Sequence, residues 1–417
     1  MPSPLAAPSY AAVLRTRHAC RTFGAALVGR LSYGTVSLSL VLATSEATDS
    51  YAVAGTVMAL FGLTSVLLSP TRAGLIDRYG PRRALPPMAG GYALLLAGLA
   101  LATAWPGASG VLLGVLAVTA GACTPPLGPV MRTLWSDLLP EPALLRRAYS
   151  LDGVAEELLL VTGPLLVGLL VHVASPSLGL AVSAALVLTG TLALVSSPAV
   201  RAAGRPAVRP AGRAAGSAAE PSADRVPLWH APGLRQAVAV AAGVGMCLAA
   251  LELLVIVVVD EHHTPGAVAW VMAALSAGSA VGGLVYGAVP WRVPARLRLS
   301  ACAAGLGLVV AAAGLSAHPH ALVGWAALGG LFVAPALTTA YLIADECAGP
   351  DTRTRAGAWV NTAFNAGASG AAAATGLLVG RLPLPACFAL AAAPALLSAA
   401  TALRAPRRPG LIVRTVR

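Results

Sequence analysis

Residues 73–83, AGLIDRYGPRR, form the segment that decides the fold of this chain. Together with the residue before it, the segment carries one aspartate and four arginines: Asp77, Arg72, Arg78, Arg82 and Arg83. Apolar runs of about 20 residues lie on both sides, which is the length that a helix needs to cross a membrane. We therefore expect a short loop at the membrane surface, on the side where arginines accumulate.

The composition indicates a membrane protein. Of the 417 residues, 57% are hydrophobic and 11% are charged, whereas a soluble domain has about 25% charged residues. The net charge of +12 would suggest nucleic acid as a partner of a soluble protein. Here the arginines fall between apolar runs, so we expect the lipid bilayer as the partner and no nucleic acid.

Apolar runs of membrane-spanning length occur twelve times, at about 22–44, 51–70, 84–104, 108–131, 149–172, 176–198, 236–259, 267–289, 299–316, 320–344, 356–380 and 384–403. With the runs numbered in order, 26 of the 28 arginines fall in the termini and in the even-numbered connections. Lys and Arg mark cytoplasmic segments. We predict a multi-pass protein of the cell membrane with both termini in the cytoplasm.

An internal repeat divides the chain into halves. A single shift of 209 residues superposes Gly74 on Gly283, Pro126 on Pro335 and Arg146 on Arg355, among others. Between the halves, residues 199–233 are rich in Ala, Gly, Pro and Arg, which is typical of a disordered linker. We predict six-helix bundles over 1–198 and 234–417, joined by a cytoplasmic linker over 199–233, with the substrate between them.

The 73–83 segment resembles the loop signature of the major facilitator superfamily, which reads roughly G-x-L-A-D-R-x-G-x-R-R. Six residues match: Leu75, Asp77, Arg78, Gly80, Arg82 and Arg83. Ala73 replaces the first glycine of the signature. An ordinary positive-inside loop would explain the arginines, but not Asp77 or Gly80. The resemblance implies an all-α fold of twelve transmembrane helices in two pseudo-symmetric six-helix bundles, in a transporter rather than an enzyme.

Acidic side chains inside the fifth run are the first candidates for function. A charge at mid-membrane costs about 2.5–3.5 kcal/mol on insertion scales, so such residues are functional candidates by default. Asp152 and Glu156 are four residues apart and share a helix face, while Arg30 and Tyr33 share a face of the first run. The resemblance implies that the first and fifth helices are neighbours. We therefore expect Arg30 to pair with Glu156 or Asp152, either as a pair that substrate or proton disturbs, or as a permanent pair that pins two helices.

The second half has lost these charges. The 209-residue shift places Asp152 on Asn361 and Glu156 on Asn365. We include both asparagines in the predicted substrate and proton-coupling site. Glu252 joins them as an isolated acid in the seventh run: it is either a proton carrier or cation site, or a neutral acid near the outer surface.

Gly163-Pro164 in the fifth run resembles the Gly-Pro motif of drug/proton antiporters of this superfamily. The motif continues with two adjacent glycines, but here a single Gly168 follows one position late. A plain proline kink, which membrane helices tolerate, explains the pair equally well. In both interpretations Gly163 and Pro164 bend the helix.

A conformational latch is predicted at the cytoplasmic ends. Its members are the charged residues and the glycine of the signature together with partners in later connections: Asp77, Arg78, Gly80, Arg82, Arg83, Asp137, Arg146 and Arg355. In the family the loop aspartate is thought to act against the start of the eleventh helix, where the helix dipole favours an acid. Simple topogenic charge is the alternative.

The combined expectation is a monomeric antiporter that uses protons to export a small, partly hydrophobic compound. No nucleotide-binding loop, catalytic triad, metal cluster or cofactor motif is apparent in the sequence. An importer or facilitator of a polar metabolite is the first alternative. A non-transporting membrane receptor on the same fold is the second.

Overall fold

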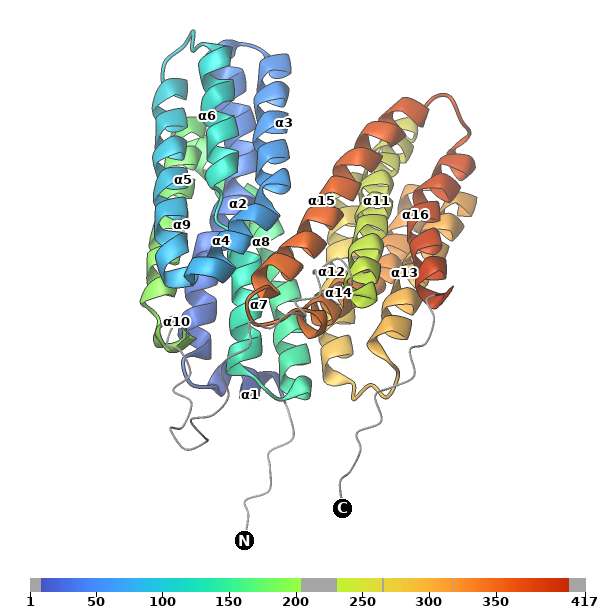
Figure 1. Ribbon diagram of the computed structural model, residues 1–417. Coiled ribbons are helices and arrows are strands. Elements are labelled where there is room, and N and C mark those ends of the chain that lie inside the picture. The colour runs from blue at the N-terminus through green and yellow to red at the C-terminus, as the bar shows by residue number, and fades with distance from the viewer. Residues whose placement is uncertain (1–8, 204–230, 265, 317, 405–417) are drawn as a thin grey trace, which may run out of the picture.

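The computed structural model describes residues 9–203, 231–264, 266–316 and 318–404, which fold into α-helices joined by short connections (Figure 1). The first half comprises α1 (Tyr10–Arg15), α2 (Ala19–Thr48), α3 (Tyr51–Leu67), α4 (Ser69–Tyr79), α5 (Pro81–Thr103), α6 (Gly110–Cys123), α7 (Leu127–Leu138), α8 (Pro142–Val173), α9 (Pro176–Ser196) and α10 (Pro198–Ala203). The second half comprises α11 (Pro232–Glu261), α12 (Ala267–Ala288), α13 (Ala295–Ala313), the 3-10 turn η2 (Gly314–Ser316), α14 (Pro319–Cys347), α15 (Arg353–Leu378) and α16 (Leu384–Arg404).

Each of the twelve predicted apolar runs lies on one long helix or on two consecutive helices. Nine helical segments of the described chain are long and apolar enough to cross a membrane, and α3 with α4, bent by 42°, makes a tenth. The two further runs form α15, which carries two asparagines and two arginines, and α16, whose apolar part is shorter. The predicted all-α membrane fold is confirmed.

The predicted surface loop at 73–83 is wrong in one respect, because most of the segment is helical. Residues 73–79 complete α4, and α5 begins at Pro81. Gly80 alone makes the turn, with a φ of +79° that glycine adopts without strain. The turn is this short because the charged residues continue the helix of the second span.

Arg72 is not a surface arginine either. It is buried, and its guanidinium donates to the carbonyl oxygens of Ser65, Gly121 and Ala122. These carbonyls lie at the ends of α3 and α6, where a helix leaves its last C=O groups without partners. Arg72 therefore stabilises two helix ends inside the first bundle.

Helix α2 crosses α8 at a point where both backbones approach closely. A Cβ on Gly163 would lie 2.4–2.6 Å from backbone atoms of Gly34, and a Cβ on Gly34 would lie 2.7 Å from the Leu159 carbonyl oxygen. Only residues without a side chain fit here. The crossing lies one helical turn from Arg30 and brings that arginine to the acidic face of α8.

The two bundles meet at one end of the molecule and diverge toward the other (Figure 1). We call the meeting end, where Asp77 lies, the Asp77 end, and the other the open end. At the Asp77 end α4 and α7 pack against α15, and α8 packs against α12. The contacts between the halves are therefore concentrated in one part of the long helices.

Most of the predicted linker, residues 204–230, lies outside the described residues. On either side of that gap, α10 includes Pro198, and α11 begins at Pro232, four residues before the predicted start of the seventh span. The boundaries 1–198, 199–233 and 234–417 stay predictions.

Candidate functional site

Two arginines and two acids form a closed cluster inside the first bundle. Arg30 Nη1 lies 2.6 Å from Asp152 Oδ1, and Arg30 Nη2 lies 3.3 Å from Glu156 Oε2. Arg132 Nε lies 3.1 Å from Asp152 Oδ2, and Arg132 Nη2 lies 2.7 Å from Glu156 Oε2. Each acid thus contacts both arginines, and the four charges sum to zero.

The two acids differ in exposure. The Asp152 side chain is fully buried, whereas the Glu156 side chain is 43% exposed. Both ion-pair contacts of Glu156 use Oε2, so Oε1 is the oxygen left for an incoming group. Asp152 holds the arginines together, and Glu156 presents the cluster to the interior cavity.

Arg132 directly follows the fourth predicted run, which ends at about residue 131, but it is not a residue of the connection. It lies on α7, it is buried, and its guanidinium carbon lies 3.7 Å from the centroid of the Tyr341 ring on α14. Thr124-Pro125-Pro126 interrupts the fourth span between α6 and α7, and the helix then continues to Leu138. The double proline was the available signal that the span extends beyond its apolar run.

Two tyrosines hold the cluster in place. The Tyr149 hydroxyl donates to the Arg132 carbonyl at 3.1 Å and lies 3.0 Å from the Ser136 hydroxyl. The Tyr33 hydroxyl donates to the Pro125 carbonyl, at the break between α6 and α7. The break is thereby tied to α2, which carries Arg30.

A cavity of about 330 Å³ lies beside the cluster, between the two halves. Its charged walls come from Arg30, Arg72, Arg132 and Glu156. The remaining walls combine aliphatic, aromatic and small polar residues of α2, α3, α4, α5, α7, α8 and the break between α6 and α7 with two asparagines of α15. The lining suits a molecule with a polar group and an apolar body.

Asn361 and Asn365 contribute the second half's side of the cavity. The Tyr341 hydroxyl lies 3.4 Å from Asn361 Oδ1, and Asn365 Nδ2 donates to the Asn361 carbonyl at 2.8 Å. Glu252 is exposed on α11 and is not part of the cavity wall. The structure therefore brings together all the predicted coupling residues except Glu252.

Gly163 and Pro164 lie within one continuous helix, α8. The contact of Gly163 with Gly34 positions α8 against α2, a role that the predicted kink does not include. The kink stays a prediction.

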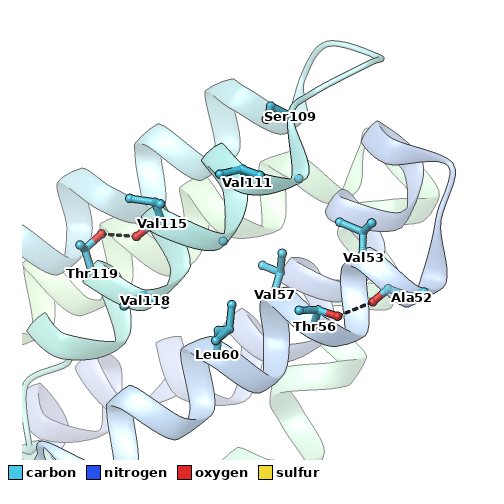
Figure 2. A pocket seen from close by; sticks show the side chains of 12 residues that line it. Ala52, Val53, Thr56, Val57, Leu60, Ser109, Val111, Val115, Val118 and Thr119 are labelled. Atoms are coloured by element: carbon cyan, nitrogen blue, oxygen red, sulfur yellow. Dashed lines mark hydrogen bonds between the residues drawn. The ribbon is translucent and has the colours of Figure 1, made fainter.

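A larger groove of about 740 Å³ runs between α3 and α6 (Figure 2). Its walls are apolar and carry no ionisable side chain. The Thr56 and Thr119 hydroxyls donate to carbonyls of their own helices, at Ala52 and Val115 (Figure 2). The groove therefore provides few groups that could bind a polar molecule, and we place the candidate site in the smaller, charged cavity.

Asp77 contacts the start of α15 from the other half. Its Oδ1 accepts the N–H of Thr354 at 3.1 Å, and its Oδ2 accepts the N–H of Arg355 at 2.9 Å. The first N–H groups of a helix have no partner inside the helix, and the dipole favours an anion there. Asp77 therefore caps α15 across the junction of the halves.

Further contacts close the same end. Asp137 Oδ1 lies 3.3 Å from Arg353 Nη1, and the Arg147 guanidinium donates to the Ala288 carbonyl at 3.0 Å. Asp137 thus pairs with Arg353, whereas Arg355 contributes its backbone N–H. The partners of Asp77 and Asp137 in the structure both lie at the start of α15.

The remaining predicted latch residues do not bridge the halves by ion pairs in the described part of the chain. Arg78, Arg82 and Arg83 are exposed, and Arg78 lies over the ring of Tyr79. Arg146 lies near Arg298 and Tyr286 of the second half. Their participation in a latch stays a prediction.

Two helical bundles around a polar cavity that is closed at one end form a membrane transporter architecture. The sequence profile of the Major Facilitator Superfamily matches residues 22–265 and 253–415, so the chain belongs to this superfamily. A search of curated proteins finds no match.

Solved structures support the same fold at low sequence identity. A bacterial homologue of the iron transporter ferroportin, in the outward-facing state, is similar with a TM-score of 0.72 and 13% identity, over 93% of this chain and 98% of that chain. The human organic anion transporter MFSD10 (TETRAN) is similar with a TM-score of 0.65 and 17% identity, over 95% of this chain and 100% of that chain. At these identities the similarity shows the fold alone.

Proposed function

We propose that this protein is a proton-coupled antiporter of the cell membrane that exports a small, partly hydrophobic compound by alternating access. Glu156 is the coupling residue. The observation that carries the proposal is the 43% exposure of the Glu156 side chain at the cavity, where it is the acidic residue of the lining, while its Oε2 is held by two arginines.

Competition for one oxygen gives the coupling. Glu156 Oε1 either binds a proton or accepts a hydrogen bond from the cargo. Binding of one excludes binding of the other. A cargo that is cationic or carries an N–H or O–H group therefore leaves when a proton arrives. Because ligand and proton compete, they cross the membrane in opposite directions, which defines antiport.

The Asp77 end supplies the closing part of the cycle. In this conformation the contacts of Asp77, Asp137 and Arg147 hold the bundles together there. With the Asp77 end in the cytoplasm, as the arginine distribution predicts, the conformation is open to the outside. Opening at the Asp77 end breaks these contacts and admits cargo from the cytoplasm.

A second candidate is symport of an organic anion, favoured by the three arginines on the cavity wall against one acid. An anion would bind the guanidinium groups that Glu156 releases on protonation. Proton and anion then bind together rather than in competition. The structural similarity to an organic anion transporter is in keeping with this candidate.

The sign of proton movement separates the two candidates. Proteoliposomes loaded with a pH-sensitive dye are given an inward gradient of ethidium, a cationic probe, or of fluorescein, an anionic probe. Antiport predicts that ethidium entry raises the internal pH, whereas symport predicts that fluorescein entry lowers it. Absence of coupled proton movement with both probes contradicts both candidates.

Two glutamine substitutions localise the coupling. Glu156→Gln is expected to abolish proton movement, because the amide at the cavity no longer titrates. Glu252→Gln is expected to leave it unchanged, because Glu252 lies outside the cavity wall. Loss of coupling in Glu252→Gln alone would move the site to α11.

A further inference from the structure

The seam between α8 and α12 joins the halves from the Asp77 end to the middle of the two helices. Arg147 donates to the Ala288 carbonyl. Further along α8, a Cβ on Gly287 would lie 2.7 Å from the Ser150 hydroxyl oxygen, and a Cβ on Gly283 would lie 3.6 Å from Val154 Cγ2. The residues of α8 in this series are three or four apart and share one face.

Glu157 continues that face and bonds across the seam. The Ser279 hydroxyl of α12 donates to Glu157 Oε1 at 2.8 Å, and Ser279 is itself buried. Glu157 also bonds to the Ser276 side chain, so its contacts with α12 lie further from the Asp77 end than the bond between Arg147 and Ala288. One turn further along α8, Val161 is 49% exposed. Glu157 thus lies where the sealed part of the seam gives way to the open part.

The surroundings of Glu157 disfavour a charged carboxylate. No arginine of the described chain forms an ion pair with it. Helix α12 presents Ser276 and Ser279, and α14 presents Ala334 to the same seam. The titratable and charged groups nearby are Glu156 on the same helix and, nearer to the Asp77 end, Tyr10, Arg146 and Arg147. Glu157 is half-buried, and a carboxylate withdrawn from water without a cation is costly.

We propose that Glu157 is a second proton-binding site, which holds the two halves together at the α8–α12 seam when it is protonated. The proton comes from water at the open end. The neutral carboxyl group exchanges hydrogen bonds with Ser279 and lets the seam close, whereas the carboxylate favours a separated seam in which water reaches it. Low pH therefore favours closure of the Asp77 end.

The inference rests on the proposed function for its role in the transport cycle, but its chemistry is independent of the cargo. Glu156 faces the cavity and sets the pH dependence of cargo binding. Glu157 faces the other half and sets the pH dependence of the conformation in the absence of cargo. The two residues are adjacent in sequence and point in different directions, because successive helical residues are rotated by about 100°.

Spin-label distances test the inference without any cargo. Labels at Arg201→Cys and Arg292→Cys, exposed positions of the two halves at the Asp77 end, are introduced into a chain whose six native cysteines are replaced. From about pH 9 to about pH 5 we expect the ratio of closed to open populations to rise on the order of tenfold, which corresponds to one unit of pKa difference between the states.

Glu157→Gln, which mimics the protonated acid, is expected to remain closed at every pH. Glu157→Asp keeps a titratable group and is expected to retain a pH response. This variant provides the test if the glutamine variant does not fold. Ser279→Ala is expected to lower the closed population and keep its pH dependence. A wild-type protein without a pH response, or a Glu157→Gln variant with the full response, overturns the inference. Either of these two results would leave the proposed role of Glu156 in probe-coupled proton movement standing.

Discussion

The two halves of the molecule share a fold but differ in charge at equivalent positions. The 209-residue shift pairs Arg132 with Tyr341, Asp152 with Asn361, and Glu156 with Asn365. In the first half these three residues belong to one charged cluster, whereas their counterparts in the second half are neutral. Arg132 lies directly over its own counterpart, Tyr341, at 3.7 Å.

This difference in charge shows how two halves with the same fold can have different roles. Neutral polar groups in the second half can approach the charged cluster without adding a charge that needs its own partner. In the proposed mechanism the first half therefore carries the proton-sensitive chemistry, and the second half supplies a surface that closes over it. The same contrast holds at the Asp77 end, where the shift pairs Asp77 with Tyr286.

Asp152→Asn is expected to have the largest effect on stability. Asp152 is fully buried between two arginines, and removing one partner from a buried ion-pair network costs about 3–5 kcal/mol. Thermal unfolding in detergent measures the loss. The equivalent change in the second half, Asn361→Ala, is the control and is expected to cost about 1 kcal/mol. Equal effects in the two halves would contradict the division of charge.

Asp77→Asn is expected to weaken closure of the Asp77 end by about 1–2 kcal/mol, since a charged cap at a helix N-terminus is lost. The labels at positions 201 and 292 should report a larger open population. Tyr286→Phe removes the hydroxyl that bonds to Thr339 within the second half, so it should leave that population unchanged. A closed population that persists in Asp77→Asn would show that Asp77 does not hold this end.

Tyr341→Leu is expected to cost about 1 kcal/mol of stability by removing the ring beneath the Arg132 guanidinium. Tyr341→Phe keeps the ring and should retain most of that energy. Thermal unfolding of both variants separates the aromatic face from the hydroxyl group. Equal losses in the two variants would assign the effect to the hydrogen bond with Asn361 instead.

Asn365→Ala should have the smallest effect. Its side chain donates to a carbonyl of its own helix and lines the cavity, so we expect a loss of less than about 1 kcal/mol in probe binding, or less than about fivefold. Ethidium binding, followed by its fluorescence, measures this. Loss of proton coupling in this variant would place the coupling chemistry in both halves.

Sequence reasoning reached the fold because span length and arginine placement are properties of the chain alone. It also placed Asp152 and Glu156 together, because four-residue spacing fixes a helix face, while the family resemblance placed Arg30 beside them. Arg72 and Arg132 were missed, because broken spans carry helix beyond the apolar runs and an arginine at the end of a run looks like a loop residue.

Contacts between the halves were harder to predict. The position of Tyr341 over Arg132 and of Ser279 beside Glu157 depends on how the bundles dock. No local pattern in α12 or α14 marks these residues. For Asp77 the prediction of a partner at the eleventh helix came from the family resemblance, and the structure supplies the two backbone donors.

The pH dependence of ethidium binding tests the central claim, that Glu156 is where proton and cargo compete. In the wild-type protein the affinity should fall about tenfold for each unit of pH below the pKa of Glu156, because the proton and the probe exclude each other. In Glu156→Gln the affinity should be independent of pH, while Glu157→Gln should retain the wild-type dependence. An unchanged pH dependence in Glu156→Gln would contradict the account.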